Sequence, residues 1–249
     1  MKKNEKTLFG LRVPECAEIK SVKKSRELGV VAMTMILNGN EVTFFRTDFL
    51  PEIKRIAWDK NEKQEIGYGF YEEIPENLAK SIRISAGIFI ARNFVMINTE
   101  KTKIVPKGIV ARGMNYEEAQ KMAASLYVPK MEATLIYGAI YDTLGRWLIA
   151  TGSLSKEEWV NSPESEEEQS AILDRICGDS DGEWTIRELF GDIFATEWTQ
   201  EMYKESGITR EGIPFSDGES MYPARKRYIY PKWLHHPVAA ARTVWFFKE

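Results

Sequence analysis

Few side chains in this sequence could carry out metal or nucleophilic chemistry. The two histidines, His235 and His236, are adjacent, so their rings are poorly placed to aim at one metal ion. A Ser-His-Asp or Cys-His arrangement would have to use this pair, and no nucleophile stands in a recognisable turn such as Gly-x-Ser-x-Gly. The two cysteines, Cys16 and Cys177, lie far apart and are expected to be reduced, buried structural thiols. We therefore predict no catalytic residue.

Carboxylates are abundant in residues 157–183, where an acidic run is more typical of a solvated face than of a catalytic pair. Within this run, residues 178–182 read Gly-Asp-Ser-Asp-Gly, and their oxygen ligands and turn-forming glycines could hold a structural calcium ion. The stretch lacks the full spacing of an EF-hand loop, so a plain polar turn is the favoured interpretation. We expect no cofactor, and calcium at this turn is the alternative.

A binding surface is predicted from residues 221–237, which read MYPARKRYIYPKWLHHP. Aromatic rings interleaved with basic groups are typical of binding hot spots, because they give rigid contact area at little cost in entropy. Nucleic-acid patches have the same composition. The alternative is that the rings pack beneath loops and the basic groups offset the acidic run. The predicted ligand-binding face consists of Tyr228, Tyr230, Trp233, His235 and His236, with Arg225 and Arg227 at its rim. A carbohydrate or protein partner suits this face better than a small apolar ligand.

Sheet is expected in the first part of the chain. The β-rich runs Val30–Leu37 and 42–46 flank Asn38-Gly39, and an Asn-Gly turn between such runs is a strong hairpin signal. Residues 85–94 read as a mostly buried strand.

Two main helices are expected further along. Asn115 can cap a helix that carries Glu117 and Glu118 in its first turn, has an apolar stripe including Ala119 and Ala123, and ends at Pro129. The second helix covers about residues 136–150 and stops at Thr151-Gly152. Apolar spacings of three and four in residues 184–201 also suit an amphipathic helix.

Composition limits the class of protein. A chain of 249 residues with 43% hydrophobic content can bury one sizeable core, in one large or two small domains. Its 34 Lys and Arg residues against 37 Asp and Glu give a net charge of -3, which offers no overall attraction to nucleic acid or to an anionic membrane. No signal peptide is expected, because no apolar run follows the positively charged N-terminus. No transmembrane segment is expected either, because the longest apolar runs fall far short of the ~20 residues that span a bilayer.

Several short motifs follow one another in a characteristic order. They are GIFIARN at 87–93, YGAIYD at 137–142, GDIFATEWT at 191–199 and AARTV at 240–244. The series resembles the formylglycine-generating-enzyme/sulfatase-modifying-factor superfamily, especially its small non-enzymatic members in phages, prophages and gut bacteria. Typical members read GFYISRYE, YGxxWD and GNVWEWT at the first three places and close on a Gly-Phe-Arg strand. In this chain Tyr141 replaces the tryptophan, the third motif is two residues longer, and both residues before Arg242 differ.

The resemblance implies an α+β, C-type-lectin-like fold that is rich in loops, with an N-terminal β-hairpin and two main helices. It implies one domain over residues 13–249, with the hairpin region at about 13–58, after a tail at 1–12. Residues 87–93, Trp147, Trp198 and Arg242 would share that domain. The catalytic relatives need paired reactive cysteines late in the chain or a three-histidine iron site, and this sequence has neither. The resemblance therefore implies a protein that is not an enzyme.

The predicted function is a non-enzymatic recognition or structural module, namely a tail-associated or receptor-binding protein of a phage or prophage. In the resembling proteins the C-terminal segment forms the exposed ligand-binding face. The expected location is the virion or the cytoplasm of the producing cell. The expected partner is a protein or carbohydrate receptor or another virion protein, oligomers could form, and neither membrane insertion nor nucleic acid is favoured. The alternatives are a catalytic member of the superfamily with an unrecognised site and a nucleic-acid-binding protein.

Overall fold

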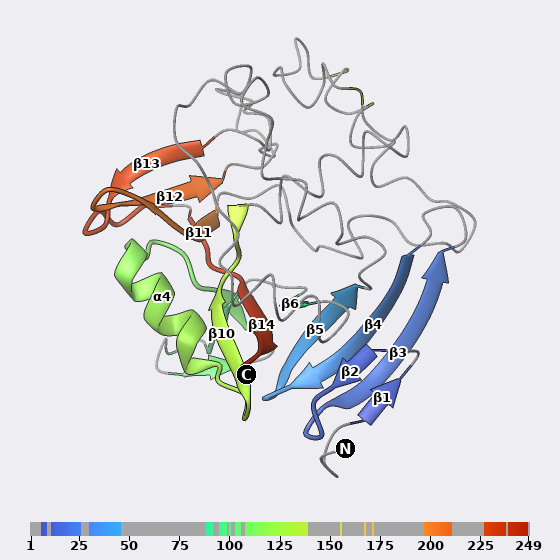
Figure 1. Cartoon of the computed structure of the whole chain (residues 1–249). Coiled ribbons are helices and arrows are strands. Elements are labelled where there is room, and N and C mark those ends of the chain that lie inside the picture. Colours follow the sequence, from blue (N-terminus) through green and yellow to red (C-terminus); the bar gives the residue numbers. More distant parts are fainter. Residues whose placement is uncertain are drawn as a thin grey trace.

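The computed structural model describes residues 6–8, 11–25, 30–45, 88–91, 95–98, 100, 103–105, 108–138, 155, 167, 171, 197–210, 227–237 and 239–248. Within these residues antiparallel sheet dominates, and one helix, α4 (Tyr116–Ser125), is described from end to end (Figure 1). The described fold is therefore β-rich, as an α+β class allows.

The main sheet has six strands, and every pairing in it is antiparallel. Its order is β10 (Met131–Leu135), β14 (Thr243–Phe247), β6 (Phe89–Ala91), β5 (Asn40–Phe45), β4 (Val30–Leu37) and β3 (Glu18–Ser25). Figure 1 shows β3 to β5 on one side of the molecule and β10 on the other, with β14 between them. Strands from opposite parts of the sequence thus complete one sheet.

The predicted N-terminal hairpin is confirmed in β4 and β5, which pair from Ala32 with Phe45 to Leu37 with Asn40. Its turn holds Asn38 at φ 48° and Gly39 at φ 75°, the left-handed backbone that asparagine and glycine adopt most readily. Met33, Met35 and Leu37 are fully buried, so alternate residues of β4 face the core.

The expected N-terminal tail contains a strand pair, β1 (Lys6–Leu8) and β2 (Leu11–Val13). The Arg12 guanidinium lies 4.1 Å from the centre of the Phe247 ring, and Val13 is fully buried, so this segment packs against the core. Cys16 follows in a surface turn in which the Ala17 amide donates to the Pro14 carbonyl at 3.0 Å. The prediction that Cys16 is buried is wrong, because this turn exposes its unpaired thiol; Cys177 lies outside the described residues.

Two smaller sheets complete the described strands. One has the order β8 (Ile104–Val105), β7 (Met96–Ile97) and β9 (Ile109–Val110). The other has the order β11 (Glu197–Tyr203), β12 (Ser206–Arg210) and β13 (Arg227–Pro231). The helix expected for residues 184–201 is therefore wrong over 197–201, and residues 184–196 lie outside the described part. Pairing with β12 makes residues 197–203 a strand, because Trp198 and Thr199 suit a sheet as well as a helix.

The first predicted helix is confirmed as α4. Its N-terminus carries a capping box, in which Asn115 accepts from the Glu118 amide and the Glu118 carboxylate accepts from the Asn115 amide. Tyr116, Ala119 and Ala123 form the buried face. The helix ends at Ser125, before the expected stop at Pro129. Of the second predicted helix only residues 136–138 are described, and the rest of 136–150 lies outside.

A buried ion pair joins the main sheet to β11. Arg242 Nε donates to Glu197 Oε1 at 3.3 Å, and Arg242 Nη1 donates to the Ala91 carbonyl at 3.1 Å. Burial raises the pKa of Glu197 to about 7, while Arg242 opposes this shift. Phe89, Ala91 and Trp198 belong to one apolar core, and Trp147 lies outside the described residues. The single domain expected over 13–249 stays a prediction.

None of the helices among these residues has the length and apolar character that a bilayer crossing requires.

Candidate functional site

The structure describes the predicted binding face unevenly. Arg225 lies outside the described residues, and Arg227 and Tyr228 are described only by the backbone of β13, paired with Arg210 and Thr209. Tyr230 lies near the end of β13, and Trp233, His235 and His236 follow in residues 231–237, called here the Trp233 loop. The geometry of the site therefore depends on these last four side chains.

Tyr230 and His236 pack inward, in a ring cluster with Tyr116 and Trp198. The Trp198 ring centre lies 5.8 Å from Tyr116, 6.1 Å from Tyr230 and 6.3 Å from His236, each contact being edge to face. Tyr230 and His236 lie 4.8 Å apart. Such edge-to-face pairs stabilise a core beyond the area they bury. For these two residues the structure follows the alternative that rings pack beneath loops.

Trp233 points the other way. It is 70% exposed, whereas Trp198 and Trp245 are fully buried. Tryptophan is among the residues whose burial from water releases most free energy, so an indole this exposed is unusual. Among the described side chains of the predicted face, Trp233 presents its ring to solvent, where a partner can reach it.

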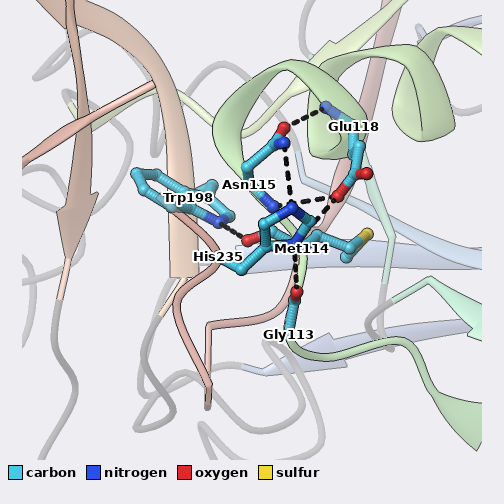
Figure 2. Close-up of polar contacts among 6 residues, drawn as sticks. All are labelled: Gly113, Met114, Asn115, Glu118, Trp198 and His235. Carbon is cyan, nitrogen blue, oxygen red and sulfur yellow. Dashed lines mark hydrogen bonds and ion pairs between the residues drawn. The ribbon is translucent and has the colours of Figure 1, made fainter. Parts of the chain in front are cut away.

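His235 fixes the Trp233 loop to the start of α4 (Figure 2). Its Nδ1 lies 3.0 Å from the Gly113 carbonyl and 3.5 Å from Glu118 Oε2, and its Nε2 lies 3.4 Å from Asn115 Nδ2. Asn115 Oδ1 accepts from the Glu118 amide, which leaves the Nδ2 group to donate to His235. These partners assign the proton of the neutral imidazole to Nδ1.

Backbone hydrogen bonds hold the loop on both sides of Trp233. Before it, the Tyr116 amide donates to the Lys232 carbonyl at 3.2 Å. After it, the His236 amide donates to the Met114 carbonyl at 3.4 Å, and the same carbonyl accepts from Trp198 Nε1 at 3.0 Å. Figure 2 shows Trp198 and His235 approaching the segment around Met114 together. The loop is therefore tied to the helix start and to the core at once.

His236 holds the end of the loop. Its Nδ1 accepts from the Ala239 amide at 3.1 Å, so the neutral ring carries its proton on Nε2. Burial lowers the pKa of His236 below its ordinary value, because water that would solvate the imidazolium is excluded. The ring is thus held in its neutral form as part of the packing.

Charged groups of both signs flank Trp233. Lys232 Nζ lies 3.4 Å from Glu117 Oε1, and the side chains are 44% and 51% exposed. Glu118, beside His235, is 49% exposed. Ion pairs this exposed add little to folding stability. They do place hydrogen-bond donors and acceptors next to an exposed aromatic ring.

Sequence reasoning missed the residues that position the loop. Asn115 and Glu118 were expected only as a helix cap, and their contacts with His235 join positions 120 and 117 residues apart. Nothing in a local pattern signals such a contact. Among the described residues no three His, Cys, Asp or Glu side chains gather as metal ligands would, and the proposed calcium turn at 178–182 lies outside them.

No family model matches this sequence, and comparison with curated proteins and with solved structures gives no match either.

Proposed function

We propose that this protein is a non-enzymatic recognition module that binds its partner through the Trp233 loop, as a tail-associated or receptor-binding protein of a phage or prophage. The observation that carries the proposal is Trp233, 70% exposed on a loop that is hydrogen-bonded on both sides. Trp233 supplies the central contact, and the neighbouring polar groups set its orientation on the partner.

The energetics of association support this use of Trp233. Removing an indole from water supplies a large part of the free energy of many interfaces, and tryptophan is among the commonest hot-spot residues. A loop that is already fixed loses little further conformational entropy when it binds. The hydrogen bonds between Lys232 and Tyr116, the first residue of α4, and between His236 and Met114, just before it, provide this preorganisation.

A C-type-lectin-like fold is part of the proposal, and the motif series supports it. Trp198 and Arg242, from the third and fourth motifs, are both fully buried. Glu197, the residue before Trp198, is the ion-pair partner of Arg242. Motif residues that are typical of a fold are expected to be buried in this way, where its strands meet. The absence of a late cysteine pair and of a third histidine supports a protein without the superfamily's catalysis.

The first prediction tests recognition directly. Many copies of the chain on fluorescent beads should bind fixed cells of the bacterium that carries the gene or serves as the phage's host, because multiple copies raise avidity. Trp233→Ala should weaken the underlying affinity about 30-fold, which corresponds to a hot spot of about 2 kcal/mol. Bead retention is measured by flow cytometry, next to the melting temperature of each variant.

Tyr127→Ala is the matched control, because Tyr127 is 52% exposed but lies beyond the C-terminal end of α4, beside Lys248. Its beads should bind as wild type does. Equal retention of wild-type and Trp233→Ala beads, or no retention of wild type, would contradict the proposed function.

A further inference from the structure

We propose that the ligand of the Trp233 loop is a neutral carbohydrate. This inference rests on the proposed function, because it names the partner of the same loop. It depends on the size of the exposed apolar surface, on the polar groups around it and on their charge.

Within the described loop residues, the exposed apolar surface is one flat ring, that of Trp233. Lys232 and Leu234, on either side, are partly buried, and His235 is held against the Gly113 carbonyl. Ile229 and Met202 are also exposed, but they belong to the strands β13 and β11 and not to the loop. A protein hot spot requires surrounding contacts that exclude water. A single indole instead matches the area of the C–H face of one sugar ring.

The polar groups around Trp233 match the hydroxyl groups of a sugar ring. Glu117 and Glu118 present half-exposed carboxylate oxygens as acceptors, and Lys232 presents an ammonium donor. Sugar hydroxyls both donate and accept, so each can be satisfied by a mixed set of this kind. Both partners of the Lys232–Glu117 pair come from segments fixed by backbone hydrogen bonds, so this donor and this acceptor are anchored on either side of a fixed backbone contact.

Charge favours a neutral ligand over an anionic one. Among the described residues around the loop, the carboxylates of Glu117 and Glu118 are matched by the ammonium of Lys232 and by Arg112, which is exposed next to Gly113. The adjoining β11–β12 turn adds one exposed group of each sign, Lys204 and Glu205. Charges that balance in this way give no net attraction to sialylated, sulfated or phosphorylated sugars or to the nucleic-acid backbone. A neutral hexose polymer with free vicinal hydroxyls needs no such attraction.

The test treats the fixed cells before the bead assay, in two separate arms. Periodate cleaves vicinal diols of sugars, and a broad-specificity protease removes surface proteins. We expect periodate to reduce Trp233-dependent retention at least 10-fold and protease to leave it unchanged. Neutral hexose oligosaccharides, such as those of glucose, should compete for the beads at lower concentration than sialylated or sulfated oligosaccharides. Trp233→Phe, which keeps a flat ring, should retain more binding than Trp233→Ala.

The outcomes separate this inference from the proposed function. If protease abolishes Trp233-dependent retention and periodate does not, the partner is a protein, and the carbohydrate inference is overturned while recognition through the loop stands. If the charged oligosaccharides compete better than the neutral ones, the inference that the ligand is neutral is overturned. If wild-type and Trp233→Ala beads bind equally to untreated cells, both proposals fail. Tyr127→Ala beads serve again as the control for the loss of an exposed aromatic side chain, since they should follow wild type in every arm.

Discussion

Trp233 stands three residues from Tyr230 and three from His236, yet these side chains meet water very differently. Tyr230 and His236 contact the buried Trp198 ring, and Trp233 is 70% exposed. At the scale of single residues, the aromatic rings of this segment therefore have two different roles. The inward rings hold the segment in place, and the outward ring is available to a partner.

This division gives a prediction for stability. Tyr230→Ala should lower the free energy of unfolding by about 2 kcal/mol, because it removes two ring contacts and leaves space beside Trp198. Trp233→Ala should change it by less than about 0.5 kcal/mol, as surface substitutions usually do. Urea denaturation followed by far-UV circular dichroism measures both. A large loss of stability in Trp233→Ala would mean that its ring packs in the fold, and the loop would lose its assigned role.

At the scale of elements, α4 both packs on the core and supports the Trp233 loop. Its capping box satisfies the amide of Glu118, and the Lys232 carbonyl satisfies the amide of Tyr116. Helix starts leave amides that need such partners. The loop thus completes the helix start, and the helix start fixes the loop.

Substitution of Asn115 separates these two roles. Asn115→Ala should cost about 1 kcal/mol of stability through the lost cap. Asn115→Ser keeps a capping oxygen but removes the amide that contacts His235 at 3.4 Å. We expect Asn115→Ser to unfold within about 0.5 kcal/mol of wild type, as a preserved cap allows, and to retain fewer beads on cells. Identical bead retention by Asn115→Ser and wild type would show that this contact does not position the loop.

The elements that sequence predicts correctly are those with local causes. The Asn38-Gly39 turn and the Asn115 cap depend on residues within four positions of each other, so short patterns contain the needed information. β11 has a non-local cause, because its pairing with β12 overrides a helical spacing of apolar residues. The composition of residues 221–237 indicated a binding face, but the side to which Tyr230 and Trp233 point depends on Trp198, more than thirty positions earlier.

At the scale of the whole molecule, the Glu197–Arg242 pair joins β11 to the segment that leads into β14. Both side chains are fully buried, and Arg242 also donates to the Ala91 carbonyl at the end of β6. A charge taken out of water must be neutralised or paired. The raised pKa of Glu197, about 7, therefore makes the stability of the fold depend on pH.

The sign of this dependence follows from proton uptake. Between about pH 4.5, where unfolded glutamate releases its proton, and about pH 7, the folded chain binds more protons at Glu197 than the unfolded chain does. Stability from this group should fall by about 3 kcal/mol as pH rises through that range. His236, with its lowered pKa, acts oppositely and destabilises the fold as pH falls below about 6.5.

The measurement is the free energy of unfolding from urea titrations between pH 4.5 and 8, for wild type and Glu197→Gln. Glutamine cannot titrate, so its profile should lack the decline that Glu197 causes. Any excess in the free energy of unfolding of wild type over Glu197→Gln should therefore shrink or reverse as pH rises. A wild-type decline that persists unchanged in Glu197→Gln would assign it to another group.

The position of β14 has a consequence for how the chain is made. β14 follows every other described strand in sequence, yet it lies inside the main sheet, between β10 and β6. Until the ribosome has released residues 243–247, β10 and β6 lack the partner that joins them, and both expose backbone groups that can pair with other chains. The main sheet therefore closes only after synthesis has passed this point. Formation of its long-range pairings is expected to be slow, and a nascent or truncated chain without β14 is the form most exposed to aggregation.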